Sequence, residues 1–302
     1  MTRTAAVFLS AALLAGASTA GRAQEDTPAA PAWEPRSSYV NMPDSAKLHY
    51  LEAGPADAKG PALLFIPGWT MPGEIWEPQL RYFSKTHHVV ALDPRSQGQS
   101  SKTPDGSYPA ARAHDLASVI DGLRLSSTVL VCWSMAVTEC LSYVDQFGTK
   151  TVAGLVLVDG LPGGAGSPPD RIASMVKFAS GFQRDRRKAT ADFVRSMYRT
   201  PQTEEYLKKV TDASLRTPTD TALALFLGTL NEDSSAAIAK VDRPTLVIGT
   251  QSPFLKSYEE MQKKIPGARL EVFEGAGHAL FVDQADKFNQ KLEAFLTGLP
   301  KQ

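Results

Sequence analysis

The chain has 302 residues, of which 43% are hydrophobic and 21% are charged, with 32 basic and 32 acidic side chains. This composition is typical of a folded protein with a substantial core, and it excludes a low-complexity or highly charged disordered chain. The balanced charge also gives no reason to expect nucleic acid or an anionic membrane as a partner.

The N-terminal segment has the pattern of a secretory signal peptide. Arg3 precedes an apolar run over residues 5–15, and small residues follow that run. We expect residues 1–23 to be removed by cleavage after Ala23 or, alternatively, after Ala20, which leaves a mature net charge of −2. The run is short for a bilayer span, so the pattern favours export to the periplasm or secretion over a retained anchor.

Residues 24–37 are rich in proline and alanine and are expected to form a flexible leader. Short apolar runs then alternate with helical patterns, which predicts an α/β fold with a mostly parallel, doubly wound sheet. The expected strands are Leu48–Leu51, Ala62–Ile66, Val89–Leu92, Thr128–Cys132, Leu155–Val158, Thr245–Ile248 and Leu270–Phe273. The expected helices are Glu74–Phe83, Ala111–Leu123, Met135–Phe147, Tyr258–Lys264 and Leu280–Leu296.

The alternation stops between residues 161 and 241, where helical patterns and prolines occur without a convincing strand. We therefore predict a helical cap at 161–241, inserted into a core formed by 38–160 and 242–302. The basic run at 184–188 is expected to be a solvated helix face or turn, in preference to a site for an anionic substrate. Four cap phenylalanines are expected to form a cap core, with one or two of them lining the cavity: Phe178, Phe182, Phe193 and Phe226.

The chain contains two cysteines, Cys132 and Cys140. The first ends a predicted strand and the second lies two turns into the next helix, so we expect poor disulfide geometry and two free, buried thiols. No histidine stands at ligand spacing from either cysteine, and no metal site is predicted.

The segment Val129–Val137 combines a short apolar strand, a single serine and the start of a helix. This arrangement is typical of a nucleophile elbow, in which a sharp turn lifts the Ser134 hydroxyl above the sheet. Such turns usually have glycine two residues to either side of the serine. Here Cys132 and Ala136 occupy those positions, which predicts a crowded turn.

Other residues supply the remaining parts of an acyl-transfer site. His278 lies at the end of a short glycine-containing loop that follows the last predicted strand. An imidazole at this place can act as a general base. The amides of Met135, at the helix start, and Trp69, after an earlier strand, are candidates for an oxyanion hole. The Trp133 side chain, next to Ser134, is expected to contact substrate.

Four motifs in this order resemble those of the α/β-hydrolase superfamily, and more narrowly its capped branch of non-haem haloperoxidase-like esterases and perhydrolases. They are Phe65–Trp69, Ala91–Ser100, Trp133–Met135 and Gly275–His278. The resemblance extends over about residues 39–299. It implies that Ser134 is the nucleophile, that His278 is the base, and that the Trp69 and Met135 amides form the oxyanion hole.

The chain departs from this family at the triad acid. In relatives the acid follows the strand that resembles Thr245–Ile248, but here that position falls on Ser252. Some branches carry the acid one strand earlier, where Asp159 stands, and the resemblance to them implies that Asp159 orients His278. The alternatives are a serine–histidine pair without an acid, or another acidic residue.

Together these features predict an exported serine hydrolase that cleaves a small-molecule carboxylic ester through an acyl-enzyme, with Ser134, His278 and Asp159 as its triad. No metal or organic cofactor is expected. We also expect neither nucleic acid nor a membrane as a partner. The sequence carries no signal for an oligomeric state. Lactone opening, amide hydrolysis or perhydrolysis at the same site are alternatives. A binding or sensor protein with weak or no turnover is the alternative from another class.

Overall fold

The computed structural model describes residues 34–164 and 167–300. The predicted signal peptide at 1–23 and most of the predicted leader lie outside these residues. The predicted leader, residues 24–37, is wrong at its C-terminal end, because strand β1 (Arg36–Asn41) begins within it. Within the described part of the chain, no helix combines the length and apolar character needed to cross a membrane.

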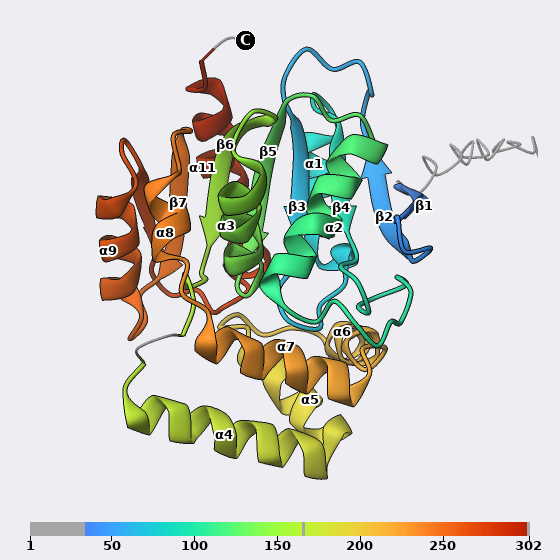
Figure 1. Ribbon diagram of the computed structural model, residues 1–302, viewed down its shortest axis with the longest axis vertical. Helices are drawn as coiled ribbons and strands as arrows, with labels where there is room; N and C mark the ends of the chain where they lie inside the picture. Colours follow the sequence, from blue (N-terminus) through green and yellow to red (C-terminus); the bar gives the residue numbers. More distant parts are fainter. Residues whose placement is uncertain (1–33, 165–166, 301–302) are drawn as a thin grey trace, which may run out of the picture. The chain divides into compact units, whose positions relative to one another are not determined.

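A single eight-stranded sheet organises residues 35–300, with the strand order β1-β2-β4-β3-β5-β6-β7-β8 (Figure 1). β2 is antiparallel to both of its neighbours, and the other strands pair in parallel. All seven predicted strands are present. The remaining bounds are β2 Lys47–Ala53, β3 Ala62–Ile66, β4 Val89–Leu92, β5 Thr128–Trp133, β6 Val152–Val158, β7 Thr245–Thr250 and β8 Arg269–Phe273.

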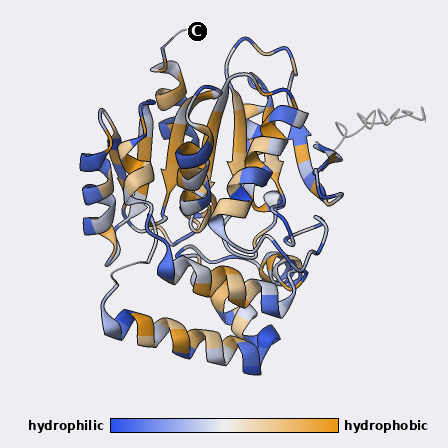
Figure 2. Cartoon of the chain, in the orientation of Figure 1, coloured by the Kyte–Doolittle hydropathy of each residue, from blue (hydrophilic) through white to orange (hydrophobic). Residues whose placement is uncertain are grey.

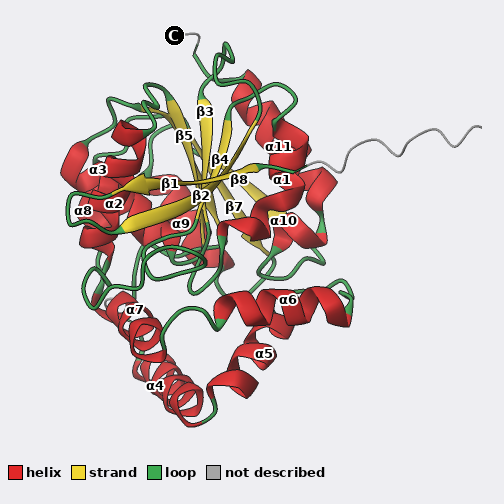
Figure 3. Cartoon of the chain, turned by 90° about the vertical axis from the view of Figure 1, so that its right-hand side faces the viewer, coloured by secondary structure: helices red, strands yellow, loops and turns green. Residues whose placement is uncertain are grey.

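Helices cover both faces of the sheet, as Figure 3 shows from the side. The strands β3 to β7 are buried along their whole length, which explains their continuous apolar sequences (Figure 2). One face carries α2 (Pro109–Gly122), α3 (Ala136–Phe147), α8 (Ser235–Ala239) and α9 (Leu255–Lys264). The other carries η1 (Gly73–Trp76), α1 (Glu77–Phe83), α10 (Leu280–Asp283) and α11 (Ala285–Thr297).

The cap lies beyond the carboxyl ends of the parallel strands (Figure 1). It consists of α4 (Pro169–Arg184), α5 (Arg186–Ser196), α6 (Glu204–Ser214) and α7 (Thr219–Asn231). α8 falls inside the predicted cap interval but packs against α3 and α9 of the core. Four helices therefore cover the end of the sheet where the residues following each parallel strand converge.

The basic run at 184–188 is mostly exposed, as expected, but Arg186 turns inward. Its guanidinium lies 4.0 Å from the ring centre of Phe182 and donates hydrogen bonds to the carbonyls of Ser214 and Thr217. Burial lowers the pKa of Arg186 to about 10. Arg186 therefore connects α5 to the end of α6, and it is the one residue of the run that departs from the predicted solvated face or turn.

Cys132 and Cys140 form a disulfide, which corrects the prediction of two free thiols. They are eight residues apart in the chain, yet their Cα atoms are 6.5 Å apart. The sharp turn at Ser134 reverses the chain, so that α3 runs back along β5 and places one cysteine beside the other. The sulfur of Cys132, which stands where related elbows carry glycine, is thus accommodated in a covalent bond beneath the turn.

Candidate active site

Ser134 occupies the turn between β5 and α3 with a φ of +59°, a left-handed conformation that L-residues seldom adopt. The space around it comes from glycines on neighbouring segments. A Cβ at Gly68 would lie 2.7 Å from the Ser134 Cβ, and a Cβ at Gly160 would lie 2.2 Å from the Ser134 carbonyl oxygen. Cys132 and Ala136 are expected to crowd the turn. Gly68 and Gly160, which have no side chain, leave the space that the turn needs.

A continuous chain of hydrogen bonds joins Ser134, His278 and Asp159. The Ser134 hydroxyl lies 2.8 Å from His278 Nε2, and His278 Nδ1 lies 2.8 Å from Asp159 Oδ2. The other carboxylate oxygen of Asp159 accepts hydrogen bonds from the Thr250 amide and hydroxyl, both at 2.9 Å. The structure thus brings together all three residues that the sequence suggested as a triad.

The environment of Asp159 keeps its carboxylate ionised. Burial acts to raise the pKa, but the hydrogen bond and charge of His278, together with the two Thr250 hydrogen bonds, outweigh it and hold the pKa below its usual value. Burial also raises the pKa of Tyr258, and the nearby Asp159 carboxylate adds to the rise. A neutral tyrosine hydroxyl therefore faces an ionised carboxylate.

Ser252, at the position that the resemblance assigns to the acid, lines one cavity together with Ser134, Asp159 and His278. Asp159 follows β6 and Ser252 follows β7, and these two strands are neighbours in the sheet. The Asp159 amide also donates a 2.7 Å hydrogen bond to the Ile248 carbonyl at the end of β7. Because parallel strands end at one edge, a carboxylate after either strand can reach the His278 ring.

Trp69 and Met135, whose amides are the predicted oxyanion donors, line the same cavity as Ser134. Within the described residues, neither amide donates an internal hydrogen bond. The Trp69 loop is held by Gln97, whose Nε2 donates to the carbonyls of Gly68 and Met71 at 3.1 and 2.8 Å. Gln97 was not singled out from the sequence, since a glutamine in a loop carries no pattern that reveals its partners.

The Trp133 side chain does not line the cavity, so the expected substrate contact is wrong. It is 1% exposed and packs against Trp76 and Phe281. Side chains alternate along a strand, so Trp133 points to the face opposite Cys132. Its indole N–H donates a 2.9 Å hydrogen bond to the His278 carbonyl, which gives it a structural role beneath the histidine.

Asp283 joins the histidine loop to the cap. Its carboxylate accepts hydrogen bonds from the amides of Gly277 and Arg199, at 2.7 and 2.8 Å. It also accepts from the amide and the hydroxyl of Thr200. The Asp283 carboxylate therefore fixes a cap segment against the residue preceding His278.

The cavity above Ser134 has a volume of about 430 Å³ and is bounded by both core and cap. Phe193 and Phe226 line it, whereas Phe182 is buried in the cap against Trp69, which confirms the expected division of the cap phenylalanines. Across residues 34–164 and 167–300, no cluster of three or more His, Cys, Asp or Glu side chains is placed to hold a metal ion.

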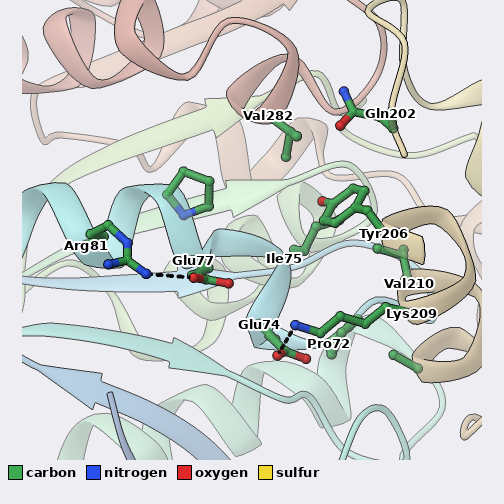
Figure 4. Close-up of a pocket in the computed structure, with 12 residues that line it drawn as sticks. Pro72, Glu74, Ile75, Glu77, Arg81, Gln202, Tyr206, Lys209, Val210 and Val282 are labelled. Carbon is green, nitrogen blue, oxygen red and sulfur yellow. Dashed lines mark hydrogen bonds and ion pairs between the residues drawn. The ribbon is translucent and has the colours of Figure 1, made fainter. Parts of the chain in front are cut away.

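A second cavity, of about 360 Å³, lies between η1, α1 and the cap helix α6 (Figure 4). An ion pair of 2.7 Å between Glu74 and Lys209 borders it, and Tyr206 points into the same space. None of the residues predicted for the active site lines this cavity. It is thus separate from the Ser134 site.

A family model described as "Alpha/beta hydrolase family" matches residues 63–291. The bifunctional esterase/perhydrolase DCH of Acinetobacter calcoaceticus is 33% identical over 125 residues, which cover 41% of this chain and 45% of that protein. The non-heme chloroperoxidase CPO-A1 of Kitasatospora aureofaciens is 26% identical over 275 residues, which cover 84% and 97%. The match with DCH therefore spans less than half of that relative.

Solved structures with similar folds include a bromoperoxidase from Bacillus anthracis, with a TM-score of 0.80 and 22% identity over 87% of this chain and 100% of that chain. The esterase EaEST from Exiguobacterium antarcticum has a TM-score of 0.79 and 21% identity over the same shares, 87% and 100%. At these identities the likeness shows a shared fold.

Proposed function

Because this chain belongs to the alpha/beta hydrolase family, we propose that it is a serine hydrolase that cleaves carboxylic esters of small molecules. The observation that carries the proposal is the hydrogen-bonded series Ser134–His278–Asp159 at the floor of a cavity. A relative whose name includes esterase and perhydrolase supports ester chemistry.

In the proposed mechanism, the Ser134 hydroxyl attacks the ester carbonyl carbon while His278 Nε2 takes its proton. The ionised Asp159 holds the imidazole through Nδ1 and stabilises the imidazolium that forms. The carbonyl oxygen becomes an oxyanion, which the amides of the cavity-lining residues Trp69 and Met135 would bind.

The tetrahedral intermediate then collapses to an acyl-enzyme, and His278 returns its proton to the leaving alcohol. A water molecule attacks the acyl carbonyl while His278 takes one of its protons, and the acid product leaves as the proton returns to Ser134. Hydrogen peroxide in place of water would yield a peracid, so perhydrolysis is a second candidate that the name of the Acinetobacter relative favours.

The test is covalent labelling by a fluorophosphonate together with hydrolysis of 4-nitrophenyl butyrate. The parent is expected to label and to turn over, and Ser134→Ala to do neither. Ser252→Ala is a matched control, because this serine also lines the cavity but takes no part in the proposed chemistry. If the parent neither labels nor hydrolyses the ester, the hydrolase proposal fails and a binding or sensor role takes its place.

We also propose that the protein is exported. The N-terminal pattern supports removal of residues 1–23, and a disulfide suits an oxidising compartment. Intact mass measurement of the full chain produced in a Gram-negative host is expected to show an N-terminus at Gln24 or Gly21. Unprocessed protein confined to the cytoplasm would contradict export.

A further inference from the structure

Two arginines from the cap are among the residues that line the cavity above Ser134. Arg171 lies in the first turn of α4, and Arg199 follows α5. Among the described residues, no carboxylate forms an ion pair with either guanidinium. Within this part of the chain, both guanidinium groups therefore lack a carboxylate partner.

The structure anchors the main chain of Arg199 and the side chain of Arg171. The main chain of Arg199 is anchored because its amide donates to Asp283, which also binds the neighbouring Thr200 amide. Asp283 thus uses its oxygens on three main-chain amides and the Thr200 hydroxyl, and not on the Arg199 guanidinium. The Arg171 guanidinium carbon lies 5.2 Å from the ring centre of Phe254, a residue that also lines the cavity.

The Arg171 charge acts on the groups beside the triad. Burial raises the pKa of Tyr258, and the Arg171 charge works in the opposite direction. Tyr258 in turn faces Asp159, so the guanidinium lies within electrostatic reach of the proposed reaction centre.

The residues that line the cavity carry more positive than negative charge. Asp159 is the only carboxylate among the described residues that line it, and this group is buried and hydrogen-bonded to His278 and Thr250. Positive charge in a partly enclosed cavity attracts anions more strongly than the same charge on an open surface, because field lines are focused there.

We propose that the substrate is an ester that also carries a free carboxylate, such as a half-ester of a short dicarboxylic acid, and that Arg171 and Arg199 bind this carboxylate. The inference rests on the proposed function, since it concerns the same site. The planar guanidinium presents paired donors that match the two oxygens of a carboxylate, and such charge-assisted hydrogen bonds are stronger than neutral ones. The ester carbonyl would then lie toward Ser134, and the carboxylate toward the cap.

The test compares kcat/KM for 4-nitrophenyl monoadipate with that for 4-nitrophenyl hexanoate, which has the same leaving group and acyl chain length but no carboxylate. The parent is expected to prefer the monoadipate by about ten-fold or more, as two charge-assisted contacts imply. In the double variant Arg171→Gln/Arg199→Gln this ratio is expected to fall to about one. Because the readout is a ratio, a general loss of activity does not count in favour of the proposal.

Arg184→Gln is the matched control, since Arg184 is an exposed arginine of the same helix that does not line the cavity. It is expected to retain the parental ratio. A parent that hydrolyses the hexanoate without preferring the monoadipate would overturn this inference and leave the hydrolase proposal standing. A parent that labels with fluorophosphonate but hydrolyses neither ester would also overturn it, whereas absence of both labelling and hydrolysis would remove the proposed function itself.

Discussion

On the core side of the cavity, Ser134, Asp159 and His278 follow the ends of strands β5, β6 and β8, whereas the cap side is lined by side chains of α4, α5 and α7. The core residues are joined by hydrogen bonds of 2.8 Å and sit on a buried parallel sheet. The cap contributes aromatic and methionine side chains and two arginines that lack carboxylate partners within the described chain.

The core and the cap are therefore expected to contribute differently to the reaction and to substrate binding. The core places polar groups with little freedom, as bond-making chemistry requires, because a strand end and its neighbours determine each position. The cap surrounds the substrate with surface and charge, which affect which molecule is bound. Substitutions in the core are therefore expected to reduce turnover, and substitutions in the cap to change preference.

Among substitutions that leave Ser134 in place, the largest effect is expected from Asp159→Asn. The variant keeps the shape of the side chain but removes the charge that would stabilise the His278 imidazolium in the proposed mechanism. We therefore expect kcat to fall by about 10⁴-fold, as when the acid of other triads is replaced. Steady-state hydrolysis of 4-nitrophenyl butyrate measures the change. Parental turnover in this variant would show that Asp159 is not the triad acid, although Ser134 could still be the nucleophile.

Two glycine substitutions, one in the core and one in the cap, compare how much each region affects kcat. Gly68→Ala puts a methyl group 2.7 Å from the Ser134 Cβ, and the resulting shift of the nucleophile is expected to lower kcat by about 100-fold. Gly181→Ala meets no atom within 4 Å in helix α4 and is expected to leave kcat unchanged. Equal losses in the two variants would contradict the division between core and cap.

The elbow disulfide is expected to contribute to stability. Cys132 and Cys140 close a loop with a sequence separation of eight residues, for which chain entropy predicts a loss of about 2.5 kcal/mol of unfolding free energy when both become alanine. Urea unfolding of the oxidised parent and the double variant measures the difference. An unchanged unfolding midpoint would show that the disulfide adds nothing to the stability of the core.

A substitution at Asp283 tests the connection between the core side and the cap side of the cavity. Asp283→Asn removes a charged acceptor shared by Gly277, Arg199 and Thr200, and the looser His278 loop is expected to lower kcat about ten-fold. Asp286→Asn is the control, since Asp286 is exposed in the first turn of α11. A loss confined to thermal stability, with kcat and its pH profile unchanged, would limit Asp283 to a structural role.

The smallest expected effect is a pH-dependent difference in stability. The pKa of Asp159 is held below its usual value of 3.8 in the folded protein. Its ionised form therefore stabilises the fold above that pH, and this contribution is lost as the pH falls through the folded pKa. The Tm difference between the parent and Asp159→Asn is expected to shrink from pH 7 to pH 3, and a difference that grows on acidification would contradict the shift.

Local sequence patterns predicted much of the core. The apolar runs identified seven of the eight strands, because strands buried on both faces need continuous apolar residues. β1 was missed because its sequence, Arg36–Asn41, is mostly polar and exposed at the sheet edge. The elbow at Ser134 was likewise visible, since a strand, a serine and a helix follow one another directly.

What the sequence by itself determined was the order of the elements and the residue types at the strand ends, including Ser134, His278 and a carboxylate after β6. Only the tertiary structure decided which side chains meet. It paired Cys132 with Cys140, turned Trp133 under His278, and brought Asp159 within hydrogen-bond distance of a ring 119 residues away in the chain. The physical reason is that periodicity and turn propensity act over neighbouring residues, whereas these contacts depend on chain reversal, strand order and the placement of the cap.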